Sequence, residues 1–132
     1  MPVTQKGWEV LFTHLVRWLA NLRRARQQRK QESIAALRDV VKVVRRTNVY
    51  MRHVHERNKR SVKQEQVLSA LWTDLGFRLK DLGLYKLAKR CEIRGAQWAD
   101  PARYDDTFLT RADISLETIE RLARQTLNEI DR

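Results

Sequence analysis

The sequence predicts an all-α fold, a single-domain antiparallel bundle of four to five helices over residues 1–132. Glycine and proline are scarce, with four and two residues among 132, whereas all-β and disordered chains are rich in them. Neither occurs from Trp8 to Leu75, and apolar residues recur there at intervals of three and four, the period of a helix with one buried face. The length is that of one domain with its own core.

The first helix is predicted to begin near Trp8, with an apolar stripe along one side. The stripe stops before Arg26 and Arg29, so the segment 23–32 is either the connection to the next helix or a helical overhang beyond the core. The predicted inward residues are Trp8, Leu11, Phe12, Leu15, Trp18, Leu19 and Leu22.

The second helix is predicted to start at an N-cap, Ser33, and to continue to about Asn58. At 100° per residue one side is apolar and the other basic. The predicted inward line is Leu37, Val41, Val44, Asn48, Met51 and His55, widened on one side by Val40, Val43, Thr47 and Val54. The predicted outer half carries Arg38, Arg45 and Arg52 on a flank, then Lys42, Arg46, Tyr50, His53, Arg57 and Arg60.

Capping signals delimit the next two helices. Ser61 with Gln64 three residues later has the spacing of a capping box, which opens a third helix that ends at Gly83. A fourth helix follows and stops at Asp100 and Pro101.

The last part of the chain is predicted to be a loop and a helix. Residues 99–114 are rich in aspartate and read as a loop, with Phe108 and Leu109 folded back onto the bundle. Ser115 then caps a final amphipathic helix. The tryptophans all fall on predicted inward stripes, which favours a core role for Trp8, Trp18, Trp72 and Trp98.

The charge is unevenly distributed along the chain. The net charge is +11, and residues 1–60 hold 15 of the 27 lysines and arginines with only four acids, whereas residues 61–132 hold 12 of each sign. The chain therefore has a basic half, 1–60, and a charge-balanced half, 61–132. Such an excess creates a positive field on one part of the surface, which suits phosphate backbones or acidic partners.

These features predict a non-enzymatic protein that binds RNA or single-stranded DNA, or the backbone of a duplex, mainly through backbone contacts of the second helix and segment 23–32. A tyrosine among the cations suits a strand whose phosphates pair with arginine while a base stacks on the ring. The alternatives are an interaction module whose basic face meets an acidic protein partner, and a merely solvated helix face. The predicted binding residues are Arg23, Arg24, Arg26, Arg29, Lys30, Arg38, Lys42, Arg45, Arg46, Tyr50, Arg52, His53, Arg57 and Arg60.

A third hypothesis comes from the string RTNVYMRH, residues 46–53. Its Arg46 and His53 satisfy the loose R-x(4-6)-H pattern and lie about 20° apart on one helical face. In this the chain resembles HEPN-type ribonucleases, which are also small helical bundles that work as dimers. The resemblance covers eight residues and implies a metal-independent ribonuclease in which His53 acts as general acid or base and Arg46 stabilises the charged phosphorane.

Size and charge also suggest an accessory role. The chain is similar in both to small basic bundles of microbial type that accompany reverse transcriptases or nucleic-acid effector complexes. Phe77 and Tyr85 lie off the predicted inward stripes, which favours a homo-oligomer or a subunit of a larger complex.

No cofactor or metal is expected. His53 and His55 are two residues apart on a helix and point about 200° away from each other, so they cannot bind one ion. The single cysteine, Cys91, lies on an apolar stripe and reads as a small buried hydrophobe, which fits a reducing cytoplasm. The sequence contains no nucleotide-binding or nucleophile motif, no signal peptide and no segment long enough to span a membrane.

Overall fold

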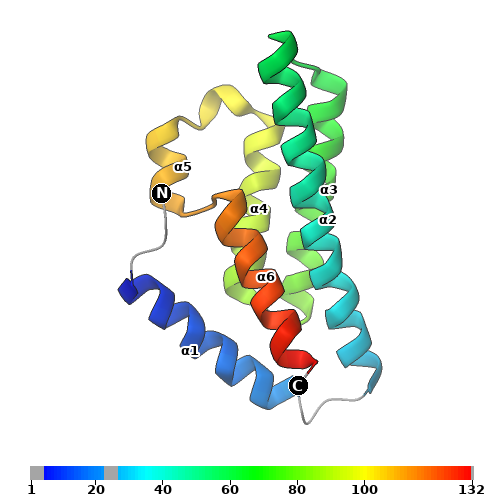
Figure 1. The fold of residues 1–132 in the computed structure, drawn as a ribbon, viewed down its shortest axis with the longest axis vertical. Coiled ribbons are helices and arrows are strands. Elements are labelled where there is room, and N and C mark those ends of the chain that lie inside the picture. Colours follow the sequence, from blue (N-terminus) through cyan, green and yellow to red (C-terminus); the bar gives the residue numbers. More distant parts are fainter. Residues whose placement is uncertain (1–4, 23–26, 132) are drawn as a thin grey trace.

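A computed structural model describes residues 5–22 and 27–131. Within these ranges the chain is helical without strands, which confirms the predicted all-α class (Figure 1). The elements in chain order are α1 (Gln5–Leu22), α2 (Gln27–Arg57), α3 (Val62–Asp81), α4 (Tyr85–Ala99), a 3-10 turn η1 (Pro101–Arg103), α5 (Asp106–Ala112) and α6 (Leu116–Ile130).

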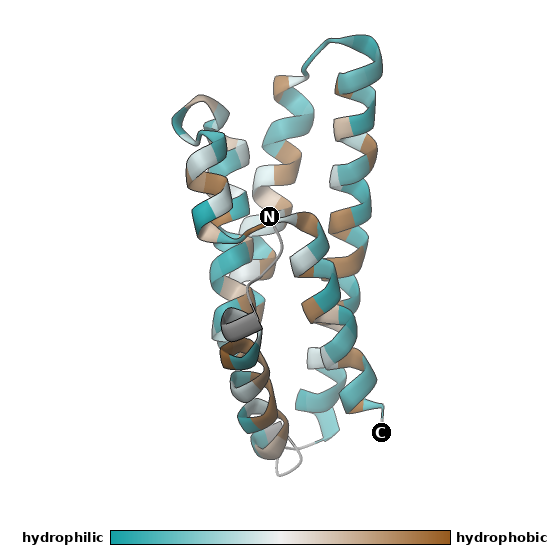
Figure 2. Ribbon diagram, turned by 60° about the vertical axis from the view of Figure 1, so that its left-hand side comes forward, coloured by the Kyte–Doolittle hydropathy of each residue, from teal (hydrophilic) through white to brown (hydrophobic). Residues whose placement is uncertain are grey.

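The long helix α2 and its neighbour α3 form an antiparallel hairpin that runs the length of the molecule (Figure 1). Helix α4 packs back along α3, and α6 packs against α2 and α4. Helix α6 accompanies only the first part of α2, so the far end of the hairpin extends beyond it (Figure 1). The turn at residues 58–61 at that end is hydrophilic (Figure 2).

Helices α3 and α4 approach closely because two glycines lie at their crossing. A Cβ atom on Gly95 would meet the backbone nitrogen of Thr73 at 3.0 Å and the carbonyl oxygen of Ser69 at 3.2 Å. The Ser69 hydroxyl donates a hydrogen bond of 2.8 Å to the carbonyl of Gly95. Gly76 faces α4 in the same way, with the backbone nitrogen of Glu92 at 3.1 Å from such a Cβ. The backbones therefore touch where side chains would separate them.

The predicted stop at Gly83 is confirmed. Gly83 has φ 86°, a left-handed conformation that glycine adopts without steric cost. The amide of Leu84 donates to the carbonyl of Leu79 at 2.9 Å and that of Gly83 to Lys80 at 3.0 Å, the bond pattern of a Schellman motif. Leu79 and Leu84 are both buried, which supplies the apolar contact that accompanies this motif.

The core contains polar groups whose hydrogen bonds are satisfied. The indole of Trp72 donates to the Thr47 hydroxyl at 3.0 Å, which itself donates to the carbonyl of Val43 at 2.8 Å. The guanidinium of Arg94, also buried, donates at 2.8 Å to the carbonyl of Ile114 just before α6, and burial lowers its pKa to about 10. These bonds fix α2 against α3 and α4 against the segment that leads into α6.

Two helix boundaries differ from the prediction. Ser33 is not an N-cap: α2 begins at Gln27, and the buried Ser33 hydroxyl donates to the carbonyl of Arg29 at 2.9 Å inside the helix. The loop at 99–114 contains η1 and the short helix α5, which Asp105 caps by accepting from the amide of Phe108 at 2.7 Å. A serine hydroxyl can either cap a helix or bond back to the carbonyl four residues earlier, and Ser33 does the second.

Three aromatic placements were wrong in whole or in part. Phe12 is 46% exposed, because the buried face of α1 turns towards α4 and α6 through Leu11, Leu15, Trp18 and Leu19. Phe108 is 42% exposed rather than folded back and contacts Tyr104 with ring centroids 5.0 Å apart. Trp8 is half-buried, whereas the inward positions of the other tryptophans, Trp18, Trp72 and Trp98, are confirmed.

The inward face of α2 differs most from the prediction. Its buried residues centre about 70° from the predicted line when placed at 100° per residue from Leu37. Consequently Asn48, Met51 and His55 are exposed rather than inward. The buried set is Ser33, Ala36, Leu37, Val40, Val43, Val44, Thr47 and Tyr50. Within it, the steps 33, 36, 40, 43, 47 and 50 alternate between three and four, the heptad spacing of helices that wrap around each other.

The described helices include none that is both long and apolar enough to cross a membrane.

Candidate nucleic-acid interface

An exposed basic surface runs along α2. Its residues occupy about 140° of the helix circumference at 100° per residue and extend over about 28 Å at 1.5 Å per residue. We call this set the basic face: Arg38, Lys42, Arg45, Arg46, Arg52, His53 and Arg57, all of them exposed. The structure thus brings half of the predicted binding residues together on one side of one helix.

Few acids neutralise the basic face. Asp39 contacts Arg78 of α3 at 2.7 Å and Lys42 at 3.9 Å, so its charge is shared with a cation outside the face. Glu56 is the other acid on this part of α2. Within the described ranges, no ion pair is formed by Arg38, Arg45, Arg46, Arg52 or Arg57. A row of like charges without counterions is destabilising by itself, and it is the arrangement that binds a polyanion.

The side chains of the basic face lie in two rows. Arg38, Arg45 and Arg52 are seven residues apart, which places successive guanidinium groups on one line about 10.5 Å apart along the axis. Lys42, Arg46 and His53 form the second row nearer α3. Between the rows lies Val49, 57% exposed, so the face offers an apolar contact among its charges.

A hollow of about 320 Å³ lies where the second row meets α3. Val49 and the buried Leu68 give it an apolar lining, and Arg46, His53 and Gln64 contribute polar groups. The hollow combines a non-polar surface with an adjacent unpaired guanidinium, which is the chemistry of a nucleotide with its flat base and charged phosphate. We refer to it as the Arg46 hollow.

The prediction that Tyr50 lies on the outer surface of the second helix was wrong. Its side chain is buried, 7% exposed, and its ring meets that of Trp98 edge-on with centroids 5.7 Å apart. The hydroxyl donates to the Glu65 carboxylate and accepts from the amide of Ser61 at 2.9 Å. Burial first, and then the bond to Glu65, raise the pKa of Tyr50. This ring contacts the edge of the Arg46 hollow but has no free face on which a base can stack.

Arg60 is engaged in the same network. Its guanidinium binds the Glu65 carboxylate through two hydrogen bonds of 2.9 Å each, and the bond to Glu65 raises the pKa of Arg60. Burial alone would raise the pKa of Glu65, but the bonds from Arg60 and Tyr50 together outweigh it and lower that pKa. Arg60 therefore closes the α2–α3 turn with its charge balanced, unlike the arginines of the basic face.

The remaining predicted residues lie at the start of α2 or before it. Arg29 is exposed and donates to the carbonyl of Leu82 at 3.3 Å, and Lys30 is half-buried. Both are about two turns from Arg38 along α2. The predicted binding residues Arg23, Arg24 and Arg26 lie outside the described residues.

No sequence pattern predicted the Arg46 hollow. Gln64 was noted only for its capping-box spacing with Ser61; in the structure the Ser61 hydroxyl accepts from the amide of Gln64 at 3.2 Å, while the Gln64 side chain lines the hollow. Leu68 is a buried core residue. The turn at residues 58–61 brings Gln64 and Leu68 of α3 beside α2. The spacing of Ser61 to Gln64, which marks the start of α3, was the local sequence signal of this turn.

Other chemistry-bearing residues are placed as structural groups. Cys91 is fully buried, as predicted, and burial raises the pKa of its thiol to about 12, which leaves it without nucleophilic thiolate at neutral pH. His55 is exposed, contrary to the prediction of a core-edge position. Within the part of the chain that the structure describes, no three histidine, cysteine or acidic side chains are placed to hold a metal ion.

Comparison with protein-family models, with curated proteins and with solved structures gave no match for this chain.

Proposed function

We propose that this protein binds RNA or single-stranded DNA through the basic face of α2, as a non-enzymatic accessory subunit. One observation carries the proposal: five exposed arginines of one helix form no ion pair within the described ranges. Phosphate contacts of this kind release counterions and supply most of the affinity of nucleic-acid binding that is independent of sequence.

The Arg46 hollow favours a single strand over a duplex. In a duplex the bases are paired and stacked, whereas an unpaired base is free to enter an apolar recess next to the backbone. Val49 and Leu68 offer such a recess, and Arg46 stands beside it for the phosphate. The proposed contacts are therefore phosphates along the two rows of cations and one unpaired base at the hollow.

Charge reversal tests the proposal. The double variant Arg45→Glu with Arg46→Glu should bind a labelled single-stranded RNA at least about tenfold more weakly than the unchanged protein, measured by fluorescence anisotropy at low salt. A matched control reverses two exposed arginines that form no ion pair with a described residue, Arg103 and Arg111. It has the same net charge and should bind nearly normally. Equal loss in both variants would mean that only net charge matters and would overturn the proposal.

An acidic protein partner is the second candidate, and exposed apolar side chains favour it. Val49 lies amid the cations at 57% exposure, and Met51, about 100° from Arg52 around the same helix, is 48% exposed. Protein interfaces combine such apolar contacts with charged rims. If this candidate is correct, the unchanged protein shows no affinity for either RNA or single-stranded DNA at low salt.

We also propose that the protein assembles, as a homo-oligomer or within a larger complex. Phe77 and Tyr85 are 56% and 61% exposed, and large exposed apolar side chains are typical of contact surfaces. Light scattering coupled to size exclusion, with absorbance at two wavelengths, would report the mass and any bound nucleic acid in one run. A monomer at micromolar concentration would contradict the homo-oligomer.

A further inference from the structure

A second hollow lies at the opposite end of the α2–α3 hairpin from the 58–61 turn. Its volume is about 500 Å³, and it is bounded by α1, the start of α2 and the turn between α3 and α4. Its lining includes His14, Arg17, Asn21, Arg29 and Tyr85, together with the apolar ring of Trp18. The described residues around it include no carboxylate. We call it the His14 hollow.

The two arginines of this hollow have guanidinium donors that are free to bind a ligand. Arg17 is exposed and forms no ion pair with any described residue. Arg29 directs one nitrogen to the carbonyl of Leu82 at 3.3 Å, which leaves the other guanidinium donors free to bind a ligand. Asn21 and the Tyr85 hydroxyl add neutral donors. Two guanidinium groups of like charge around one space are stabilised by an anion between them.

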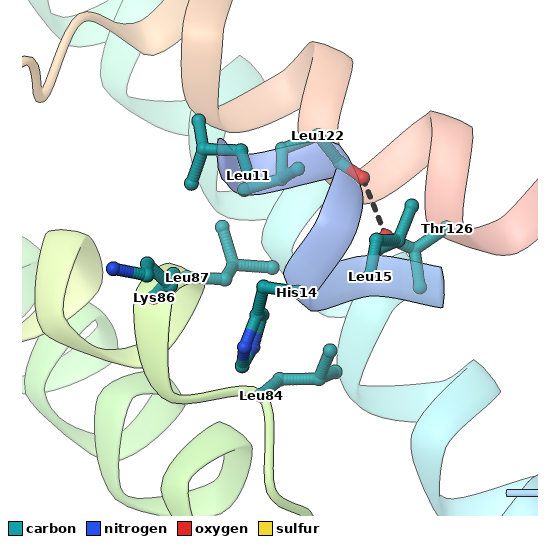
Figure 3. Close-up of a pocket in the computed structure, with 8 residues that line it drawn as sticks. All are labelled: Leu11, His14, Leu15, Leu84, Lys86, Leu87, Leu122 and Thr126. Atoms are coloured by element: carbon teal, nitrogen blue, oxygen red, sulfur yellow. Dashed lines mark hydrogen bonds between the residues drawn. The ribbon is translucent and has the colours of Figure 1, made fainter. Parts of the chain in front are cut away.

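The His14 side chain, which lines this space, has an unsatisfied ring nitrogen. Its Nε2 atom is buried and has no hydrogen-bond partner among the described residues. Figure 3 shows the ring between α1 and the start of α4, beside Leu84 and Lys86. Burial, then the charges of Lys86 and Arg17, lower the pKa of His14. A buried polar atom without a partner is uncommon in native proteins and calls for an explanation.

The backbone leaves this space accessible. Gly83, with φ 86°, lines the hollow without a side chain. The indole of Trp18 donates to the carbonyl of Leu82 at 2.9 Å and so fixes the turn against α1. Helix α4 starts here, and its N-cap, Leu84, provides no side-chain hydrogen bond. The partial positive charge of that helix end adds to the charge of the arginines.

We propose that the His14 hollow binds a phosphate group, either free inorganic phosphate or the terminal phosphate of a nucleotide. Two arginines line this space, and a guanidinium pairs with phosphate oxygens through its charge and its fork of donors. The size of the hollow exceeds that of phosphate alone and falls in the range of small-molecule sites, and the exposed ring of Tyr85 lies beside it for a base. The site does not depend on the basic face, which begins at Arg38.

The pKa of His14, followed by NMR, tests the site. Adding inorganic phosphate should raise the pKa of His14 by about one unit, because a bound anion offsets the charges of the neighbouring cations. Sodium chloride at the same ionic strength should not raise it as much. The charged or titratable groups around His14 are Arg17 and Glu9 on α1, Lys86 and Tyr85 on α4, and Arg29 on α2; α6 contributes only Leu122 and Thr126.

Arg17→Gln should weaken phosphate binding about tenfold, whereas Arg111→Gln, an equal change of charge elsewhere on the surface, should leave it unchanged. Two results would overturn the proposal. One is that phosphate shifts the pKa of His14 no more than chloride does, and the other is that phosphate shifts it equally in Arg17→Gln and in the unchanged protein. Competition by a 5′-phosphorylated dinucleotide but not by its 5′-hydroxyl form would identify a nucleotide as the source; competition by neither would identify free phosphate. Loss of RNA binding in Arg45→Glu with Arg46→Glu leaves this result unaffected, so the two proposals fail separately.

Discussion

The hydroxyl of Tyr50 on α2 donates a hydrogen bond to the carboxylate of Glu65 on α3. Arg60, in the turn between the two helices, binds the same carboxylate. This network fixes the rotation of α2 about its axis near the end of the hairpin. With Tyr50 turned inward at the edge of the buried face, the basic face points outward: Arg46 lies about 40° from Tyr50 around the helix and Arg45 about 140°.

Removal of the Tyr50 hydroxyl should destabilise the hairpin. Tyr50→Phe leaves the ring packed against Trp98 but removes the bond to Glu65, and we expect the free energy of unfolding to fall by about 2 kcal/mol. Chemical denaturation followed by circular dichroism measures it. Tyr85→Phe is the matched control, since that side chain is 61% exposed and its loss of hydroxyl should change little. Equal stability of the two variants would show that the network contributes nothing.

Acid should weaken the docking of α1 through His14. The pKa of His14 is lowered from 6.5 in the folded protein, so the unfolded chain takes up this proton first as the pH falls. Stability is therefore complete above about pH 6.5 and declines below it. The midpoint of thermal unfolding between about pH 7.5 and about pH 5.5 measures the effect.

His14→Leu should remove this part of the pH dependence, whereas His55→Gln, at an exposed position, should retain it. Unfolding midpoints that fall in parallel with pH in His14→Leu and the unchanged protein would contradict the assignment.

A methyl group at Gly95 should separate α3 from α4. Gly95→Ala brings a Cβ to 3.0 Å from the backbone nitrogen of Thr73, where no side-chain movement relieves the contact. We expect the free energy of unfolding to fall by roughly 1 to 3 kcal/mol because of the close contact. The higher helix propensity of alanine, about 1 kcal/mol over glycine, acts in the opposite direction. Urea denaturation measures whether the free energy of unfolding falls or rises in Gly95→Ala. A more stable Gly95→Ala protein would mean that helix propensity outweighs the contact, and that the two helices are not so closely packed.

His53 separates binding from catalysis. Arg46 and His53 line the same hollow, as the ribonuclease hypothesis requires, but His53 is exposed and forms no hydrogen bond with a described residue. If the protein only binds, His53→Ala should retain RNA affinity within about threefold, and neither protein should cleave a labelled RNA. Cleavage by the unchanged protein that His53→Ala abolishes would establish the nuclease instead.

Local signals predicted most of the helix order. Ser61, Gly83 and Ser115 act within their own turns, through a hydroxyl that caps the next amides or a residue free to adopt a left-handed conformation. Their effect does not depend on the rest of the fold, so the sequence alone located the starts of α3 and α6 and the end of α3.

The rotation of α2 was not predictable in the same way. Apolar residues cover so much of its surface that two inward lines about 70° apart fit the pattern, and the choice between them depends on where α3 and α6 pack. Tyr50 lies about 140° from the predicted inward line but only about 70° from the observed one, at the edge of the buried face. Its burial follows from a carboxylate, Glu65, fifteen residues away in sequence, and the Arg46 hollow likewise needs two helices in place.

The salt dependence of single-stranded RNA binding shows whether the basic face contacts phosphates. If the five unpaired arginines of the basic face contact phosphates, the logarithm of the association constant should fall with the logarithm of salt concentration with a slope of about −3 to −4. Arg45→Glu with Arg46→Glu should reduce that slope by one to two units, estimated as roughly 0.7 per lost contact, while Arg103→Glu with Arg111→Glu should preserve it. A slope near zero, or one that the basic-face variant leaves unchanged, would contradict phosphate binding by the basic face.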